Sequence, residues 1–315
     1  MDSIGLKHLI SSSNSMDYDR TLSHETELNF SVLEKAMQEE LGIEHLTKDI
    51  LRTLGLLRNE QYTIAGELLA DTNNNLRSAT NIVRFGDTIS IFLERQDLQK
   101  ISLLEQYTEA SALFQKWYAP YEEIVGSKRV KKIQIPEKAF REALANALVH
   151  RRYDVNSAIQ IAMFKDRIEI TSPGGLLDNL SREDFLYGQA SLLRNMTIAE
   201  VFHRLNIIEK FGTGIHRIRL EYEGFTEQPQ FQITDHSISV ILPVVGSGFG
   251  IEGDNLSEKI LSLLGSRGAM SRAQLEKATG YGKTKIYETL NLLKSSNRIE
   301  AVGKGRGTRY KLTNK

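Results

Sequence analysis

Three polar side chains near the middle of the chain are spaced so that they share one side of a helix. Glu142, Asn146 and His150 follow one another at intervals of four residues, and residues four apart stack on the same side of an α-helix. Leu144 and Val149 belong to an apolar side that can pack on a sheet. A carboxylate, an amide and an imidazole in this arrangement predict a binding or catalytic surface. The alternative interpretation is a solvated helix face with an Arg-rich end.

The composition is that of a globular chain long enough for two or three domains. It has 315 residues, of which 40% are hydrophobic and 25% are charged. The absence of cysteine excludes disulfides, thiolate metal sites and thiol nucleophiles. No apolar run approaches the roughly 20 residues that a membrane span needs, and the first residues lack the features of a secretory signal. We therefore expect a cytoplasmic protein with no membrane partner.

The charge of the chain is unevenly distributed although its formal net charge is zero. From Asn255 onward there are 13 Lys and Arg residues and 4 Asp and Glu residues, so this part has a net charge of +9 and the rest has −9. An acidic body with a basic C-terminal part indicates that this part meets a polyanion. The glycine-dense segment 246–254 precedes the change of sign and is predicted to be a linker.

The elements before this linker are predicted from the spacing of apolar residues. The first region, 1–125, is expected to contain two strands at 82–85 and 88–92 in hairpin fashion and a long helix over 103–124. In the region 126–245, Pro136 opens the helix that carries the stripe. The remaining elements predicted there are a hairpin over 158–171 with its turn at Lys165-Asp166, a helix from 197 to about 210, a helix that follows Gly212-Thr213-Gly214, and a strand over 237–245.

The region 255–315 has the pattern of three helices followed by two strands. Its helices are predicted at 256–264, 272–278 and 283–295, with Ser271 and Gln274 as a capping box before the second. Strands at 299–302 and 308–312 would enclose a flexible basic tip. This order resembles a winged helix-turn-helix domain, which binds double-stranded DNA through the start of its last helix and through its wing. The residues placed there are Lys283, Thr284, Lys285, Tyr287, Lys304, Arg306 and Arg309. The alternative is a protein-docking or dimerisation unit whose charges solvate the surface.

Three separated motifs in the region 126–245 resemble the GHKL family of ATP-binding domains, which includes gyrase and the histidine kinases. They are Glu142-x-x-x-Asn146 on a helix, Ser172-Pro173-Gly174-Gly175 after a strand, and Gly212-Thr213-Gly214 before another helix. The stretches 136–153, 166–176, 194–195 and 208–215 resemble more closely the divergent branch found in RecG-like transcriptional regulators. The implied fold is α+β, with helices layered on a mixed sheet in a GHKL (Bergerat-like) sandwich, plus the C-terminal winged helix.

The resemblance implies roles for individual residues. Asn146 would be a ligand of Mg²⁺ and Glu142 the general base that activates water. The cofactors implied are ATP and Mg²⁺. The nucleotide would contact Asn146, His150, Ser172, Gly174, Gly175, Gly212, Thr213 and Gly214. Ser172 stands where other members of the family have the aspartate that accepts a hydrogen bond from the adenine amino group, so it is a neutral acceptor at that place.

The first region resembles the later portion of a Schlafen AlbA-type domain with a helical connector. Ser12-Ser13-Asn14, 54–57 and 63–69 carry this resemblance, and no site residue is assigned to it. No phosphate-binding loop of the Gly-x-x-x-x-Gly-Lys-Ser/Thr type occurs, so a helicase motor is not expected. The sequence predicts a DNA-binding transcriptional regulator, with a homodimer as one possible assembly, whose GHKL-like domain senses nucleotide. The alternatives are a weak ATPase or an inactive scaffold whose winged helix docks a protein.

Overall fold

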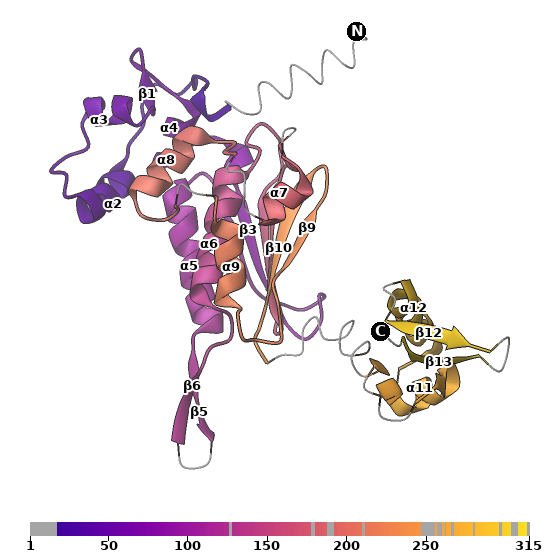
Figure 1. Cartoon of the computed structure of the whole chain (residues 1–315). Coiled ribbons are helices and arrows are strands. Elements are labelled where there is room, and N and C mark those ends of the chain that lie inside the picture. The colour runs from indigo at the N-terminus through magenta and orange to yellow at the C-terminus, as the bar shows by residue number, and fades with distance from the viewer. Residues whose placement is uncertain are drawn as a thin grey trace, which may run out of the picture. The chain divides into compact units, whose positions relative to one another are not determined.

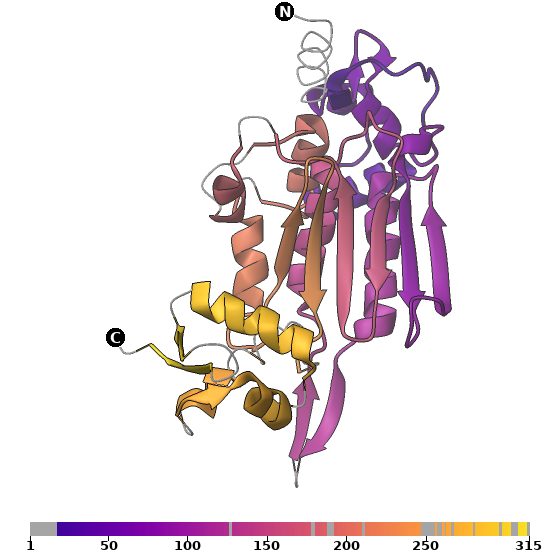
Figure 2. The same ribbon diagram turned by 90° about the vertical axis from the view of Figure 1, so that its right-hand side faces the viewer.

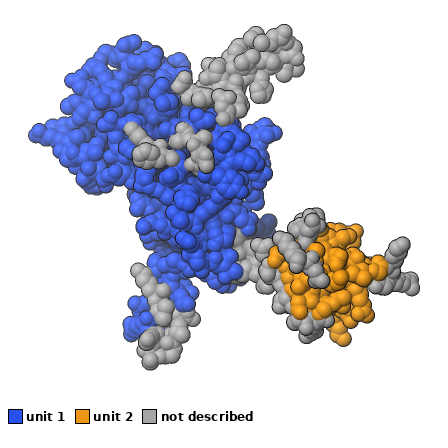
Figure 3. Space-filling view, in the orientation of Figure 1, with its two compact units in different colours: residues 1–247 blue, residues 248–315 orange. Residues whose placement is uncertain are grey.

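The computed structural model describes most of the chain in two compact units, residues 1–247 and 248–315 (Figure 3). In the first unit the described residues are 18–125, 128–177, 180–187, 192–209 and 212–246. In the second they are 256, 260–261, 263–265, 268–279, 281–295, 298–303 and 308–313, of which Thr284 and Lys285 are described by their backbone alone. The division between the units falls inside the segment 246–254 that the sequence predicts as a linker.

A six-stranded mixed sheet forms the centre of the first unit. The strands lie in the order β4 (Phe92–Leu98), β3 (Thr80–Phe85), β7 (Ile159–Met163), β8 (Arg167–Pro173), β10 (Ser237–Pro243) and β9 (Gln230–Ile233). Neighbours pair antiparallel except β3 and β7, which are parallel. The β7–β8 hairpin and its turn lie where alternating isoleucines predict them, because one face of each strand is buried.

Three helices cover one face of this sheet (Figure 2). They are α5 (Leu103–Tyr118), α6 (Glu137–His150) and α9 (Gly214–Glu221). The side chains at alternate positions of β7, such as Ile159, Ile161 and Met163, are buried towards the core, whereas Gln160 between them is exposed. The first unit is therefore α+β with helices layered on a mixed sheet, as the sequence predicts.

The N-terminal part of the chain belongs to the same core. One hydrophobic cluster extends from Phe30 through Ile82 and Phe140 to Leu242. The strands β4 and β3 form one end of the sheet, next to β7. Residues 80–98 therefore share a core with residues 137–243, although the sequence patterns place them in different regions. The other elements of this part are η1 (Tyr18–Arg20), α2 (Ser31–Leu41), α3 (Lys48–Thr53), β1 (Leu57–Arg58), β2 (Gln61–Tyr62), α4 (Ile64–Leu69) and η2 (Leu76–Ser78).

A buried carboxylate in the N-terminal part forms hydrogen bonds to a helix near residue 200. Asp19 is fully buried, and its Oδ2 accepts hydrogen bonds from the backbone N–H groups of Thr197 at 2.7 Å and Ile198 at 3.2 Å. These two donors begin the helix α8 (Met196–Arg204), so Asp19 satisfies N–H groups that have no partner within the helix.

Three predicted boundaries in the first unit are wrong. The second arm of the first hairpin is β4 at Phe92–Leu98, not 88–92. The long helix ends at Tyr118 because Pro120 follows, and β5 (Tyr121–Val125) pairs with β6 (Lys128–Lys132) instead. The helix α8 ends at Arg204, where Asn206 has a φ of 53° that does not continue a helix. Figure 1 shows the β5–β6 hairpin pointing away from the sheet.

The second unit has a small core of its own. It contains β11 (Met270–Ser271), α11 (Arg272–Thr279), α12 (Lys283–Ser295), β12 (Ile299–Val302) and β13 (Arg309–Leu312), and its strands lie in the order β11-β13-β12. The core includes Leu275, Ile286 and Leu290. Ser271 and Gln274 form the predicted reciprocal cap, because Ser271 N–H donates to Gln274 Oε1 at 2.9 Å and Gln274 N–H donates to Ser271 Oγ at 3.3 Å. In the helix predicted at 256–264, the described residues 256, 260–261 and 263–264 are helical.

The helices in the described part of the chain are too short or too polar to cross a membrane.

Candidate nucleotide pocket

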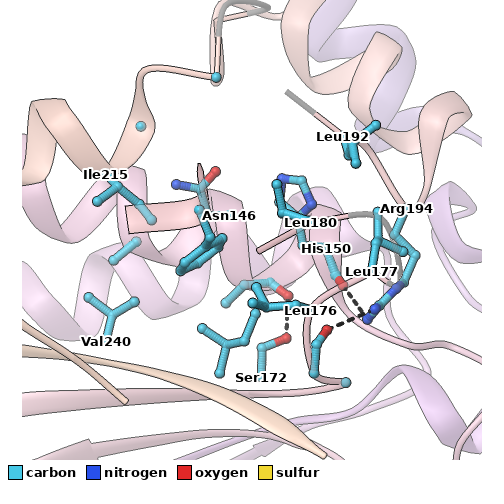
Figure 4. Close-up of a pocket in the computed structure, with 18 of the residues that line it drawn as sticks. Asn146, His150, Ser172, Leu176, Leu177, Leu180, Leu192, Arg194, Ile215 and Val240 are labelled. Carbon is cyan, nitrogen blue, oxygen red and sulfur yellow. Dashed lines mark hydrogen bonds between the residues drawn. The ribbon is translucent and has the colours of Figure 1, made fainter. Parts of the chain in front are cut away.

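A pocket opens between α6, the start of α9 and the strands β8 and β10 (Figure 4). About 960 Å³ of space lies inside it, a volume that includes open solvent. Seven residues that the sequence assigns to nucleotide binding line it: Asn146, His150, Ser172, Gly174, Gly175, Gly212 and Gly214. The other lining side chains are mostly aliphatic, such as Ile170, Ile215 and Val240. Four separate parts of the chain therefore meet at one cavity.

Two of the three polar side chains predicted to share one side of α6 line this pocket, and the third does not. Asn146 and His150 line the cavity, whereas the side chain of Glu142 is 12% exposed and lies one turn earlier. Asn146 Nδ2 donates a hydrogen bond to Glu142 Oε1 at 3.2 Å, which leaves Asn146 Oδ1 as an oxygen donor. An amide oxygen beside a carboxylate is a donor set that suits Mg²⁺, with phosphate and water oxygens as further ligands.

The surroundings of Glu142 raise the pKa of its carboxyl group. Burial raises the pKa of Glu142 above its usual value, and the Arg217 guanidinium and the Asn146 amide oppose this rise. A carboxylate with a raised pKa is a suitable acceptor for a proton from water.

The glycine at the start of α9 lies directly against this pair of side chains. A Cβ atom at Gly214 would lie 2.7 Å from Asn146 Nδ2 and closer still to Glu142 Oε1, so a larger residue would displace the pair. Gly212 has a φ of 62°, a left-handed conformation that favours glycine. Thr213 precedes the helix, and its carbonyl accepts a hydrogen bond from Arg217 N–H at 2.9 Å. Thr213 does not line the pocket, unlike its two neighbours.

The glycines after β8 have a packing role that the sequence does not reveal. Gly174 has a φ of 110°, and a Cβ atom there would collide with Arg194 and lie 2.7 Å from Arg152 Cγ. A Cβ atom at Gly175 would lie 2.5 Å from the carbonyl oxygen of Asp235. The expectation that these glycines admit a nucleotide remains a prediction, whereas their close approach to protein atoms is a property of the fold.

Ser172 is buried at the end of β8, and its hydroxyl is committed as a donor. Its Oγ donates a hydrogen bond to the carbonyl oxygen of Ala147 at 2.8 Å (Figure 4). The Ser172 oxygen can still accept a hydrogen bond where other family members have an aspartate. Among the described residues that line the pocket, none is Asp or Glu.

The last turn of α6 is fixed by two neighbouring residues in a distant loop. Asn195 Nδ2 donates to the carbonyl oxygens of Val149 and Arg151, both at 2.7 Å. Arg194 Nη1 donates to the carbonyl oxygen of His150 at 3.1 Å. These carbonyls have no partner within the helix, so the two side chains cap its C-terminus and fix the direction of His150.

The His150-Arg151-Arg152 sequence does not form a cationic cluster at the pocket. Arg151 is fully buried and donates to the carbonyl oxygens of Ala79 and Ser157, while Arg152 forms an ion pair with Asp154. Burial, and then the charge of Arg194, lowers the pKa of His150 to about 4. At neutral pH His150 therefore offers the pocket an uncharged imidazole.

This shifted pKa predicts a change of stability with pH. The unfolded chain, in which His150 has its ordinary pKa of 6.5, binds the proton more readily than the folded chain. The stability that His150 contributes is therefore complete above pH 6.5 and is lost as the pH falls towards 4. Thermal unfolding followed by circular dichroism should show that wild type loses melting temperature faster than His150→Gln over this interval. Parallel curves for the two proteins would show that His150 is not held neutral.

Sequence reasoning missed several residues that shape the pocket. The aliphatic and aromatic side chains of Leu176, Leu177, Leu180, Phe185 and Leu192 line it from the segment that follows β8 and contains α7 (Arg182–Tyr187). Arg217 was also missed, although its position in the first turn after the glycine motif places it close to Glu142.

Three of the residues predicted to contact DNA have exposed side chains in the second unit. Lys283 lies at the start of α12, Tyr287 follows one turn later and is 52% exposed, and Arg309 begins β13. Thr284 and Lys285 lie in the first turn of α12. Lys304 and Arg306 lie outside the described residues.

One family model matches part of the chain. Residues 156–242 match the family described as "Putative ATP-dependent DNA helicase recG C-terminal". The match runs from just before β7 into β10 and supports an ATPase-like domain there. It begins after α6, so Glu142, Asn146 and His150 are attached to this domain by the geometry of the pocket and not by the match. No curated protein matches the chain.

A solved structure resembles almost the whole chain. It is that of the DIP2311 protein from Corynebacterium diphtheriae, with a TM-score of 0.59 and 17% sequence identity over 94% of this chain and 70% of that one. At this identity the likeness shows a shared fold alone.

Proposed function

We propose that the chain is a DNA-binding transcriptional regulator whose ATPase-like domain binds ATP together with Mg²⁺. The observation that carries the nucleotide part is the pocket itself. Asn146 from α6, Ser172 from β8, Gly212 before α9 and Gly214 at its start line one cavity, although nearly 70 residues separate the first from the last. The cavity adjoins the segment that matches an ATPase-like family.

The chemistry of the lining supports a nucleotide as the ligand. Aliphatic side chains such as Ile170, Ile215 and Val240 offer a dry surface for a flat base. The N-terminus of α9 and its glycines offer backbone N–H groups to phosphates. Asn146 Oδ1 would hold Mg²⁺, which neutralises phosphate charge when bound.

The DNA-binding part of the proposal depends on the second unit. A helix pair followed by a β12–β13 hairpin is the order of a winged helix-turn-helix domain. The exposed Lys283 lies at the start of the last helix, and the exposed Arg309 begins β13 opposite Val302, the last residue of β12. The basic charge of this part supports a polyanion as partner. The homodimer that such regulators form on palindromic sites remains a prediction.

Titration of fluorescent double-stranded DNA at low salt, with and without ATP and Mg²⁺, tests the coupling of the two parts. A regulator that senses nucleotide should change its DNA affinity when ATP is added, because the ligand must bind two arrangements of the protein differently. The absence of DNA binding even at low salt would overturn the DNA-binding part. DNA binding that ignores ATP would overturn the sensing.

An ATPase is the second candidate function, and the position of Glu142 favours it. A buried carboxylate with a raised pKa beside the proposed Mg²⁺ ligand can accept a proton from an attacking water. If the protein hydrolyses ATP, Glu142→Gln should lower phosphate release by about 100-fold or more and leave ATP affinity nearly unchanged. Equal, background-level release from wild type and variant would remove the enzymatic candidate.

A further inference from the structure

The guanidinium of Arg217 lies between two carboxylates beside the pocket. Its Nη1 is 3.9 Å from Glu142 Oε2, and its Nη2 forms a close ion pair with Glu209. The exposed fractions of the three side chains differ: 12% for Glu142, 37% for Arg217 and 55% for Glu209. Arg217 therefore connects a largely buried carboxylate beside Asn146 to an exposed one that follows α8.

Arg217 occupies a position that a helix alone does not favour. It is the fourth residue of α9, and a cation near a helix N-terminus opposes the positive end of the helix dipole. Anions on both sides compensate for this, and the proposed nucleotide would add phosphates at the same helix N-terminus. Gly214, three residues earlier, lies against Glu142 and Asn146, so a phosphate bound there would be one helical turn from Arg217.

The second arginine of the site differs from Arg217 in its partners. Arg194, which lines the pocket, is 5% exposed and donates to the backbone carbonyls of His150 and Gly175. A guanidinium held by two carbonyls caps a helix and is fixed by the fold. Arg217 is shared by side chains instead, is more exposed, and can exchange one carboxylate for another oxyanion through its forked donors.

We propose that Arg217 binds the terminal phosphate of a nucleoside triphosphate and makes this site prefer a triphosphate to a diphosphate. The proposal rests on nucleotide binding at the pocket. One positive charge between two negative ones leaves this cluster with a net charge of −1 when both glutamates are ionised. A terminal phosphate that replaces Glu142 as the partner of Arg217 gains a charge-assisted, forked contact that a diphosphate cannot reach.

The ratio of the dissociation constants for ADP and ATP tests this proposal. Both should be measured by calorimetry with Mg²⁺ for wild type, Arg217→Ala, Arg217→Lys and Glu209→Gln. In Arg217→Ala the affinity for ATP should fall about tenfold or more while that for ADP changes little, since a hydrogen bond to a charged group is lost for ATP alone. Arg217→Lys should recover part of the preference. Glu209→Gln should strengthen it, because one competitor for Arg217 is neutralised.

A matched control is available on the same pair of helices. Lys138 of α6 and Glu221 of α9 form an ion pair that is also 3.9 Å long, and Glu221 lies at the end of α9 opposite to Gly214. Neither Lys138 nor Arg217 is a lining residue of the pocket, but only Arg217 contacts Glu142. Lys138→Ala should leave the ratio unchanged. If Arg217 only ties α9 to α6, Arg217→Ala should weaken ATP and ADP equally and lower the melting temperature, which would overturn the proposal.

Failure of the proposal can be separated from failure of the proposed function. A wild-type protein that binds both nucleotides with a ratio unaffected by Arg217→Ala keeps the nucleotide pocket and loses the role of Arg217. A wild-type protein that binds neither nucleotide, although its thermal unfolding is cooperative, loses both.

Discussion

Replacement of Asn146 by alanine is expected to remove the magnesium-dependent part of ATP affinity. The amide lies at the pocket with Nδ2 bound to Glu142, so that its Oδ1 is the protein oxygen placed to hold the metal. Loss of one oxygen ligand to a cation should weaken ATP binding in Mg²⁺ by about 10- to 100-fold. Displacement of a fluorescent nucleotide analogue measures this, with Mg²⁺ and then with EDTA.

The chelator separates a metal role from a packing role. In EDTA, wild type and Asn146→Ala should bind ATP with similar, weak affinity, because neither then holds a metal. Asn146→Asp serves as a second variant, since a carboxylate is also a hard oxygen donor and should retain the response to Mg²⁺. A wild-type affinity that is the same in Mg²⁺ and EDTA would contradict the assignment of Asn146 as a metal ligand.

Neutralising Lys283 and Arg309 together should weaken DNA binding at every sequence and make it less sensitive to salt. Both side chains are exposed, one at the start of α12 and one at the start of β13. Each lost phosphate contact should reduce the slope of log K against log salt by about 1, so the double alanine variant should lose about 2. Fluorescence anisotropy over a series of salt concentrations gives both the affinity and the slope.

The control for this variant lies on the same helix. Lys294 is an exposed lysine at the opposite end of α12, and a recognition helix contacts DNA mainly through its N-terminal residues. Lys294→Ala should therefore keep the wild-type slope. If all three substitutions changed the slope equally, the basic surface would act without a preferred face and the winged-helix mode of binding would be wrong.

Local patterns predicted the elements whose two faces differ. The β7–β8 hairpin was found because isoleucines alternate with polar residues on strands that have one buried face. The helix α6 was found because its apolar and polar sides are separate. The cap formed by Ser271 and Gln274 was found because that motif has a local hydrogen-bond pattern.

Edge strands and long-range pairings could not be predicted in the same way. The strand β4 is the edge of the sheet, so Glu94 and Arg95 are accommodated in it and its sequence does not alternate. Ile89 belongs to the alternating pattern that predicted a strand at 88–92, but it lies in the turn before β4 and is 72% exposed. The parallel pairing of β3 with β7 joins residues about 80 positions apart, and no local pattern contains that information.

Site residues that belong to a sequence motif could be predicted. Residues whose role depends on which segments pack around them could not. Asn146 and Gly214 were assigned to one site by the resemblance of their motifs to the GHKL family, and the structure places them against each other. Gly174 was interpreted as room for a ligand, yet its surroundings are Arg194 and Arg152. Arg217 was overlooked because its two partners, Glu142 and Glu209, come from two other segments, which only the fold brings together.

Isothermal calorimetry of the wild-type protein with ATP and Mg²⁺ tests the central claim most directly. The account predicts saturable binding at one site per chain, weakened when EDTA removes the metal and weakened again by Asn146→Ala. No heat of binding for ATP, ADP or GTP at millimolar concentration, from a protein whose thermal unfolding is cooperative, would show that the pocket between α6 and α9 is not a nucleotide site.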